Sequence, residues 1–496
     1  MIVREKGFHP NYRNRKILEI CLSIIAGLLL GLLIVFDSFL PLSSEFQKLI
    51  LVIPFVLIIV ILFDNLEKLV LVVFALGVPL NLDVSLIVSP YAANTENIRK
   101  GLRTLITTTE LRISIVTIAL LIGYVLWLVS PGGTEHKPVR FYASTTIPAL
   151  GFIFLSILSV IQATDKQLWF FRVEQLIEVF LVYFYLVNHI QTTHDMQFFM
   201  IVFLGGLLAE SVLMIIQWIT GLNFVFAGIE VSSMGPMRIE GTLGNTGPAA
   251  GYLSAMSIIA MAMIWGFQTK NQKRFAAITM VLSIIALIST GSRIGWVGFA
   301  LTLMAFLLAG QKYGWIKPRA LFLITMLAFL IGTSFFGIIS ERLSTLNDSS
   351  AQSRPMMWKL AWNIIQAHPW LGVGAGNYAL MTRKYYTPDI GLESEVFDKI
   401  VHNAYLGVWA ESGTFALLSY VGFLGLAFLS AWSCIRSHSK FVSRLGMGLA
   451  LAIISLCIQM VTGTFHTRPI TLFVWLLVAL AASLPNLEKE KTVSLI

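Results

Sequence analysis

Four arginines and one histidine are the residues of this chain best suited to chemistry on an anionic substrate. They are Arg238, Arg293, Arg354, Arg468 and His402. The planar guanidinium of arginine can hold a phosphate through two charge-assisted hydrogen bonds at once. An imidazole, with an ordinary pKa of about 6.5, is the best general base available near neutral pH. The set therefore indicates an anion site beside a base.

Glu411 is a carboxylate that we consider as the group that orients His402. Nine residues of continuous helix, however, rotate by about 900° and rise by about 13 Å. That places Glu411 on the opposite face of the helix and deeper in the bilayer. We predict a buried structural or gating charge, unless the helix breaks near Asn403 or Gly413.

Two other motifs have a chemical and a structural interpretation. Gly372-Val-Gly374-Ala-Gly376 superficially resembles a nucleotide loop, but no helix start follows it, so we predict a tight backbone path or a close approach to a ligand. The acidic residues Glu393, Glu395 and Asp398 could hold a divalent cation, but a solvated loop explains them equally well. We predict no metal site and no cofactor.

The composition determines the class of protein. Of 496 residues, 56% are hydrophobic and 12% are charged, whereas a soluble domain has about 45–50% and about 25%. The apolar residues form blocks of about 17–25, each long enough to cross a bilayer as a helix. The sequence therefore predicts an all-α, polytopic integral membrane protein with about 12–14 transmembrane helices. Its net charge of +9 reports membrane orientation, and no nucleic acid is predicted as a partner.

The expected spans lie near 17–36, 48–63, 67–89, 111–130, 145–163, 169–188, 197–220, 248–267, 274–290, 292–310, 320–338, 404–433, 443–463 and 469–485. We divide the chain into a cytoplasmic N-terminus (1–16), N-terminal helices (17–200), core helices (201–338), a long extracytoplasmic loop (339–403), C-terminal helices (404–485) and a cytoplasmic tail (486–496). The three cysteines, Cys21, Cys434 and Cys457, form neither a disulfide framework nor a metal-ligand spacing.

Basic residues orient this topology. Those before the first span, together with clusters such as Lys270/Lys273/Arg274 and Arg436/Lys440/Arg444, are expected on the cytoplasmic side. The stretch 91–111, with Arg99, Lys100 and Arg103, conflicts with an alternating count, so it docks on the membrane or the early count is off by one.

The loop 339–403 is the extramembrane region large enough to form a site. Within it we predict a helix that begins at Ser353-Arg354-Pro355 and ends at His368, with Trp358, Trp362 and Ile365 on one face at the membrane interface. The arginines have an alternative, which is separate contact with lipid headgroups, and this applies most to Arg238 and Arg468. His368 and His466 also lie outside and compete with His402 as the base.

The ordered set of motifs resembles the O-antigen ligase and O-antigen polymerase superfamily of bacterial membrane glycosyltransferases. The matching stretches are Arg238-Ile-Glu-Gly241-Thr-Leu-Gly-Asn245, Ser289-Thr-Gly-Ser-Arg293, Arg354-Pro-Met-Met-Trp358, Pro369-Trp-Leu-Gly-Val-Gly-Ala-Gly-Asn377-Tyr378, and His402-Asn403 with Glu411-Ser-Gly413. The similarity covers roughly residues 200–485. It leaves ligase and polymerase as alternatives.

The resemblance implies a GT-C-like scaffold that moves a glycan from undecaprenyl diphosphate to an acceptor glycan, either a lipid A core or a growing polysaccharide. It implies an inverting, metal-independent reaction on the periplasmic side of the bacterial cytoplasmic membrane. The implied catalytic residues are His402, Arg293 and Arg354. We expect Arg238, Arg468, Asn403, Tyr405 and Trp358 to bind substrate.

Two alternatives stay open. A transporter or flippase of the same lipid-linked glycans would suit outer arginines, and Glu178, Glu210 and Glu411 could then relay protons. We find no inverted repeat in the sequence, and the polar groups are concentrated on the outer side, which favours a transferase. A protein O-oligosaccharyltransferase would look nearly the same.

Overall fold

The computed structural model describes residues 66–493, with gaps at 80–82, 89–109, 130–138, 227–228, 234–237, most of 320–348, 398 and 464. The spans predicted near 17–36 and 48–63, and most of the one near 320–338, lie outside the described residues. The same holds for the basic residues of the stretch 91–111 that conflicted with the topology.

The described part is all-α, with five short strands. Its helices are α3 (Leu66–Leu76), α5 (Ile115–Val129), α6 (Ala143–Leu158), α7 (Lys166–His189), α8 (Thr193–Thr220), α9 (Thr246–Gly266), α10 (Lys270–Ser289), α11 (Arg293–Lys312), α14 (Ser349–Ala367), α15 (Tyr378–Met381), α16 (Glu393–Val396), α17 (Ala404–Ser412), α18 (Thr414–Ser433), α19 (Lys440–Met460) and α20 (Arg468–Val493). The strands are β1 (Asp83–Val88), β2 (Glu110–Ser114), β3 (Phe224–Phe226), β4 (Ile229–Ser233) and β5 (Ile239–Gly241), and they form an antiparallel pair β1-β2 and a sheet of order β3-β4-β5.

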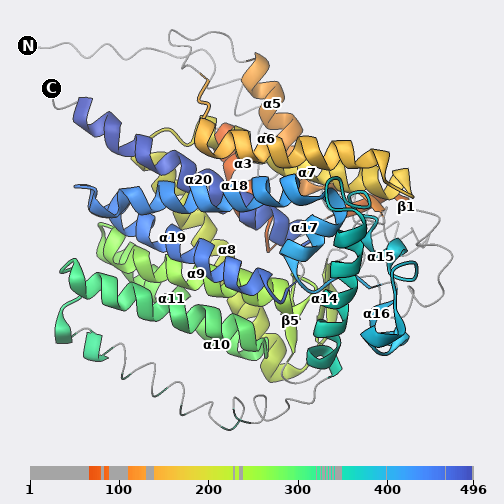
Figure 1. The fold of residues 1–496 in the computed structure, drawn as a ribbon. Helices are drawn as coiled ribbons and strands as arrows, with labels where there is room; N and C mark the ends of the chain where they lie inside the picture. The colour runs from red at the N-terminus through yellow and green to blue at the C-terminus, as the bar shows by residue number, and fades with distance from the viewer. Residues whose placement is uncertain are drawn as a thin grey trace, which may run out of the picture.

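Eight helices of the described chain are long and apolar enough to cross a membrane. They are α6, α8, α9, α10, α11, α18, α19 and α20, and α6 and α18 continue for a few residues as 3₁₀ turns. Most of them run from left to right in Figure 1, and α8 crosses the bundle at a steeper angle. The prediction of an all-α polytopic membrane protein is confirmed.

Three expected spans differ in the structure. Instead of one span over 67–89, the chain forms the short helix α3, turns at Gly77–Pro79 and continues as β1, because the residue before a proline avoids the helical conformation. The span expected over 111–130 begins as β2, and α5 covers only 15 residues. The span expected over 404–433 is divided at Gly413 into α17 and α18.

Small residues allow the central helices to pack closely. Helix α9 is buried along nearly its whole length and packs against α19. A Cβ atom at Gly448 of α19 would meet the Cβ atom of Ala262 at 2.8 Å, so the two backbones are as near as a glycine permits. Without a strong hydrophobic drive between helices in lipid, such close contact supplies the packing energy.

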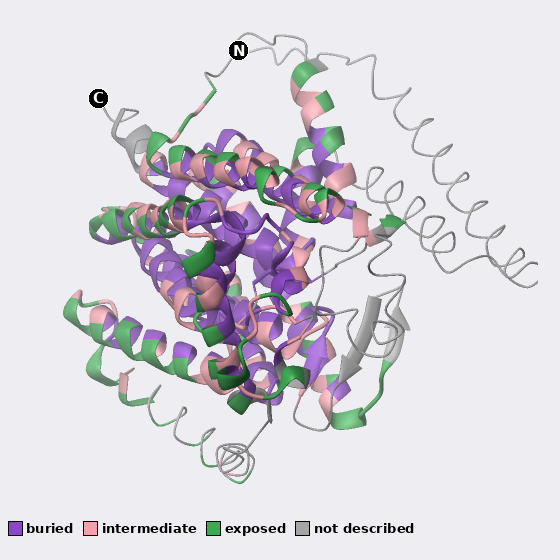
Figure 2. Cartoon of the chain, turned by 45° about the vertical axis from the view of Figure 1, so that its right-hand side comes forward, coloured by how far each residue is buried: buried purple, intermediate pink, exposed green. Residues whose placement is uncertain are grey.

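Large apolar side chains are exposed on the outward faces of the bundle, whose helices alternate between exposed and buried residues in Figure 2. Exposed side chains include Ile147 and Phe154 on α6, Leu301 on α11, and Leu418 and Leu429 on α18. Large exposed apolar faces are unusual in a soluble monomer, but they suit helices that contact lipid tails.

Residues 349–403 form a small second core beside the bundle. Met357, Leu360, Ile364 and Ile365 of α14 pack with apolar residues of the following loop, such as Tyr378. The predicted helix begins four residues early, at Ser349, and Pro355 lies inside it. Trp358, Trp362 and Ile365 share one face of this helix, as their spacing predicts. Ile365 is buried, whereas Trp362 is 44% exposed and makes an edge contact with Trp409.

Glycines dock this second core on α17. Backbone N–H groups of Val373 and Gly374 donate to the carbonyls of Ala410 and Glu411, at 2.9 and 3.0 Å. A Cβ atom at Gly372 would meet the backbone carbon of Glu411 at 2.3 Å. The predicted tight backbone path is confirmed, and its neighbour is the protein's own helix.

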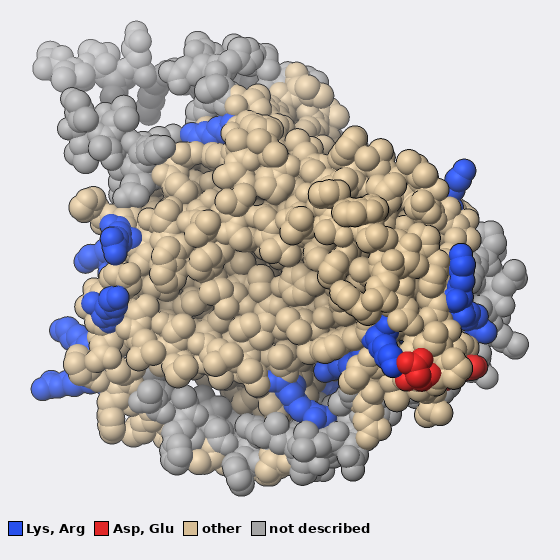
Figure 3. All heavy atoms as spheres, in the orientation of Figure 1, with Lys and Arg blue, Asp and Glu red and all other residues tan. Residues whose placement is uncertain are grey.

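Basic residues mark the connections at one end of the bundle. Lys270, Lys273, Lys312, Arg436 and Lys440 all lie at or near helix ends there. Figure 3 shows Lys and Arg at both ends of the molecule, and Asp and Glu on this face only at the right. The opposite end carries α14, α17 and the starts of α9, α11, α18 and α20 (Figure 1). This second end holds the candidate site.

The break at Gly413 generates a prediction about stability. Gly413 has a φ of +86°, and a Cβ atom there would lie 1.9 Å from the carbonyl oxygen of Trp370. We expect Gly413→Ala to reduce the stability of the folded protein by at least about 1–3 kcal/mol, from backbone strain alone. Thermal unfolding in detergent measures it.

Gly425→Ala is the matched control, because Gly425 lies within α18 with no atom within 4 Å of its added Cβ. In a helix interior that change is neutral or stabilising. Equal unfolding midpoints for the two variants would contradict the role given to Gly413.

Candidate active site

His402 lies where the loop of the second core meets α17. Its side chain is half-buried. The charges that act on its ring belong to Arg354 of α14 and to Lys399. Trp358, one turn beyond Arg354, donates its indole N–H to the backbone oxygen of His402 at 3.2 Å. The structure therefore brings together three of the predicted site residues, Arg354, Trp358 and His402.

The surroundings keep the His402 ring neutral. Burial, followed by the charges of Arg354 and Lys399, lowers the pKa of His402 to about 4. No hydrogen bond joins this ring to another residue in the part of the chain that the structure describes. A neutral imidazole in this state can accept a proton from a substrate hydroxyl.

Asn403 and Tyr405 each make a structural hydrogen bond. Asn403 caps α17, because its side-chain oxygen accepts from the backbone N–H of Leu406 at 3.0 Å. The hydroxyl of Tyr405 donates to the backbone oxygen of Cys457, in α19, at 3.0 Å. These bonds fix the start of α17, and the role of both residues in substrate binding stays a prediction.

Arg293 and Arg238 begin elements at the same end of the bundle. Arg293 is the first residue of α11, which Ser292 caps. A Cβ atom at Gly295 would contact Ala250 of α9 and Gln459 of α19, so the start of α11 lies beside the start of α9 and the end of α19. Arg238 immediately precedes β5 and is half-buried. No hydrogen bond connects either arginine to His402 among the described residues.

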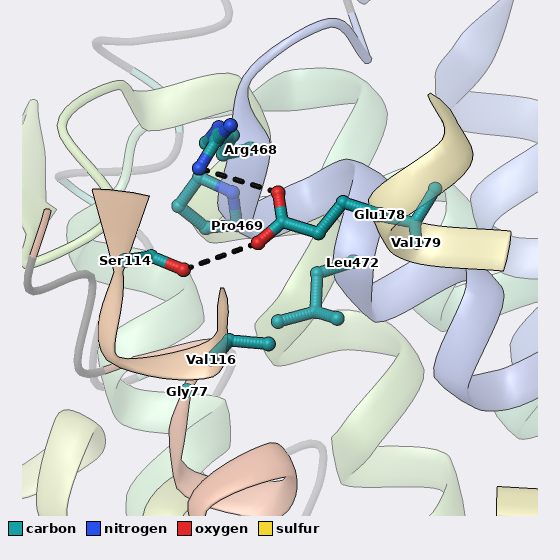
Figure 4. Close-up of a pocket in the computed structure, with 8 residues that line it drawn as sticks. All are labelled: Gly77, Ser114, Val116, Glu178, Val179, Arg468, Pro469 and Leu472. Atoms are coloured by element: carbon teal, nitrogen blue, oxygen red, sulfur yellow. Dashed lines mark hydrogen bonds and ion pairs between the residues drawn. The ribbon is translucent and has the colours of Figure 1, made fainter. Parts of the chain in front are cut away.

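Arg468 has two carboxylate partners. Its guanidinium forms ion pairs with Glu174 at 2.9 Å and with Glu178 at 3.2 Å. Figure 4 shows Arg468, Glu178 and Ser114 around a small pocket whose other walls are apolar. Binding of a phosphate here would compete with these carboxylates, and the predicted substrate contact of Arg468 stays a prediction.

The sequence analysis missed a buried cation, Arg172 of α7. Its side chain is 5% exposed and contacts the ring of His466 at 3.0 Å and the side-chain oxygen of Gln175 at 2.7 Å. The charge of Glu411, which is buried as predicted, also acts on Arg172. An arginine inside the span expected over 169–188 was the signal that could have found it.

The two other carboxylates expected inside the membrane have fixed partners. Glu210 of α8 accepts from the backbone N–H and the hydroxyl of Thr242, at 2.9 and 2.7 Å. Glu178 accepts from the hydroxyls of Ser114 and Thr117, besides its ion pair with Arg468. Both tie helices to neighbouring segments.

Among the described residues, the acidic residues of the loop 339–403 belong to no group that could hold a metal ion. The described residues contain no group of three or more histidine, cysteine or acidic residues that could hold a metal ion. Asp398, the last member of the predicted acidic cluster, lies outside the described residues.

Comparison with known families identifies the region around this site. Residues 278–421 match the model of the O-antigen ligase family. This segment runs from within α10 into α18 and contains Arg293, Arg354 and His402. The search of curated proteins found no matching relative.

The cations around His402 generate a prediction about pH. We expect kcat/KM to stay level as the pH falls from 7, with an acid limb near pH 4, because the free enzyme keeps His402 neutral until then. Lys399→Gln removes one cation, so the pKa of His402 rises and the limb moves to higher pH. The initial rate of glycan transfer, measured over a range of pH for the wild type and for Lys399→Gln, gives the acid limb of each protein.

Lys312→Gln, at the opposite end of the bundle, is the control and should leave the limb in place. The lowered pKa of His402 also reduces the free energy of unfolding as the pH falls from about 6.5 to about 4. In that range this histidine binds a proton in the unfolded chain but not in the folded one. An identical acid limb in wild type and Lys399→Gln would contradict this electrostatic coupling.

Proposed function

We propose that this chain, a member of the O-antigen ligase/polymerase superfamily by its match over residues 278–421, is a glycosyltransferase. It moves a glycan from undecaprenyl diphosphate to a hydroxyl of an acceptor sugar, in the synthesis of cell-surface polysaccharide. The observation that carries this proposal is the neutral His402 beside Arg354 and Lys399, inside the matched segment.

His402 acts as the general base. Its neutral ring nitrogen takes the proton of the acceptor hydroxyl while the hydroxyl oxygen forms a bond to the anomeric carbon. The bond from that carbon to the diphosphate breaks on the opposite face, so the configuration inverts. The leaving diphosphate carries away the electron pair and the developing negative charge.

The cations serve that leaving group. Arg354, and Arg293 at the start of α11, would bind the diphosphate, and preorganised charges of this kind stabilise charge that develops in the transition state. The N-termini of α9 and α11 add positive ends of helix dipoles at the same end of the bundle. In this proposal the arginines do the work that a metal ion does in other transferases, and Arg238 and Arg468 assist.

Substrate binding would also strengthen the base. A diphosphate near Arg354 and Lys399 offsets the two charges that lower the pKa of His402. The pKa then rises toward its ordinary value of about 6.5. His402 would thus become a better proton acceptor when the donor is in place.

The charge asymmetry supports the orientation. Lysines and arginines in short connections favour the cytoplasmic side. The short connections at the end opposite the site carry Lys270, Lys312 and Arg436, and in Figure 3 that end shows basic residues alone, whereas the other end shows both basic and acidic residues. We propose that the protein spans the bacterial cytoplasmic membrane with the site facing the periplasm. The polyprenyl chain would then lie in the bilayer beside the apolar outer helices.

The carboxylates weigh against the transporter or flippase. A relay needs groups that exchange protons in turn, whereas Glu178 and Glu210 are held by hydrogen bonds between segments. The acceptor separates the remaining alternatives, which are a lipid A core, a growing polysaccharide or a protein in the case of an O-oligosaccharyltransferase.

The base assignment has a direct test. We expect His402→Gln to lower kcat for transfer from a radiolabelled polyprenyl-diphosphate oligosaccharide by about 10²–10⁴-fold, since a general base contributes that much. Purified protein in detergent is assayed with EDTA and without it, and EDTA should leave wild-type activity unchanged. His368→Gln, whose histidine contacts Tyr385, is the control and should transfer normally. Full activity of His402→Gln would contradict the general-base assignment, and loss of wild-type activity in EDTA would contradict a metal-independent reaction.

The arginines are tested separately. Each of Arg354→Ala and Arg293→Ala should lower kcat/KM for the lipid-linked donor by about 10–100-fold, which corresponds to the loss of a charged hydrogen bond to the diphosphate. Expression and membrane insertion should be those of the wild type. Lys273→Ala, at the other end of the bundle, should transfer normally. Unchanged activity of Arg354→Ala would contradict a contact with the diphosphate and favour a contact of Arg354 with lipid headgroups.

A further inference from the structure

Helix α17 is the connection between the proposed base and the membrane bundle. Asn403 caps its start, directly after His402, and Gly413 ends it after nine residues. Any shift or tilt of so short a helix moves His402 relative to Arg354, which belongs to another element. The contacts along α17 therefore decide how well the site is aligned.

One end of α17 is held at Glu411. Its backbone oxygen accepts from the N–H of Gly374 at 3.0 Å, and its carboxylate is 7% exposed. The buried guanidinium of Arg172 acts electrostatically on that carboxylate. Removing the guanidinium would leave the buried carboxylate without this compensating charge.

The middle of α17 is held through His466. The guanidinium of Arg172 can only donate, so the ring nitrogen Nδ1 that it meets at 3.0 Å accepts. The proton of the neutral ring is then on Nε2. That nitrogen faces Gly407 of α17, where a Cβ atom would lie 3.0 Å away. The ring of His466 thus fills the space between Arg172 and α17.

Burial keeps the His466 ring in its neutral protonation state. Burial and the charge of Arg172 lower the pKa of His466 to about 3, so the ring stays neutral and keeps accepting from Arg172. Gln175 takes another donor of the same guanidinium at 2.7 Å. Arg172 lies in α7, outside the segment 278–421 that matches the family.

We propose that Arg172 is a positioning residue for glycan transfer: acting through His466 and Glu411, it holds α17 so that His402 faces Arg354 and the bound donor. This inference rests on the proposed function. Reacting groups need to be held within about 0.5 Å of their productive geometry. A displacement of about 1 Å costs about 100-fold in rate.

The first experiment compares Arg172→Gln with Arg444→Gln. Arg444 is the matched control, a partly buried arginine that lies over the ring of Trp315 at 4.2 Å, at the opposite end of the bundle. We expect Arg172→Gln to lower kcat by about 10–100-fold while KM for the polyprenyl-diphosphate donor changes less than about twofold. The control should lose stability without that loss of kcat. Equal kcat values for the two variants at similar unfolding midpoints would overturn the proposal.

A second measurement does not depend on activity. Hydrogen–deuterium exchange of peptides covering residues 402–412 should be at least about tenfold faster in Arg172→Gln than in wild type, and unchanged in Arg444→Gln. Unchanged exchange over α17 in Arg172→Gln would overturn the proposal. Wild-type protein that transfers no glycan would instead overturn the proposed function, and exchange would still decide whether Arg172 holds α17.

Gly407→Ala tests the same contact from the other side. Alanine favours the helix, so the substitution should leave the stability of the fold equal or higher. We expect kcat to fall all the same, because the added methyl group presses on the ring of His466. Wild-type kcat in this variant would contradict the spacing role of His466.

Discussion

A charge inside an apolar bundle must have a partner or lie at an end of the bundle, and this constraint arranges much of the molecule. Taking an isolated ion out of water costs several kcal/mol even after the protein relaxes. Accordingly the exposed Lys270, Lys312 and Lys440 of the membrane helices lie at helix ends. The charged residues described within the bundle, such as Arg172, Glu178 and Glu210, have hydrogen-bonding partners.

The same constraint gives the buried cations specific partners. Arg468 and Arg172 have partners that come from distant parts of the chain and that balance or orient them. Arg354 and Lys399 act on the half-buried, neutral ring of His402 at the edge of the second core. In the proposed function, the arrival of an anionic donor would change the electrostatics of that ring.

Two cores meet at α17, and their junction is built from backbone groups. Gly372 brings the loop of the second core against Ala410 and Glu411, closer than any side chain would allow, and the next two backbone N–H groups donate to the same residues. Gly413 then redirects the chain into α18. Backbone contacts of this kind have little freedom to adjust, so the position of His402 follows from the packing of elements far from it in sequence.

The sequence by itself determined the class of protein, most of the apolar helices from α6 onward, and a resemblance that the family match supports over residues 278–421, the segment that contains Arg293, Arg354 and His402. These properties depend on local composition, hydrophobic length and short motifs, which a single chain displays directly. Only the tertiary structure decided that 67–89 is a helix and a strand and that Gly413 divides α17 from α18. It also decided that the charge of Lys399 acts on His402 and that Arg172 contacts His466 beside α17. Those outcomes depend on contacts between residues up to about 300 positions apart, such as Arg172 with His466, and no local pattern contains the energy of such contacts.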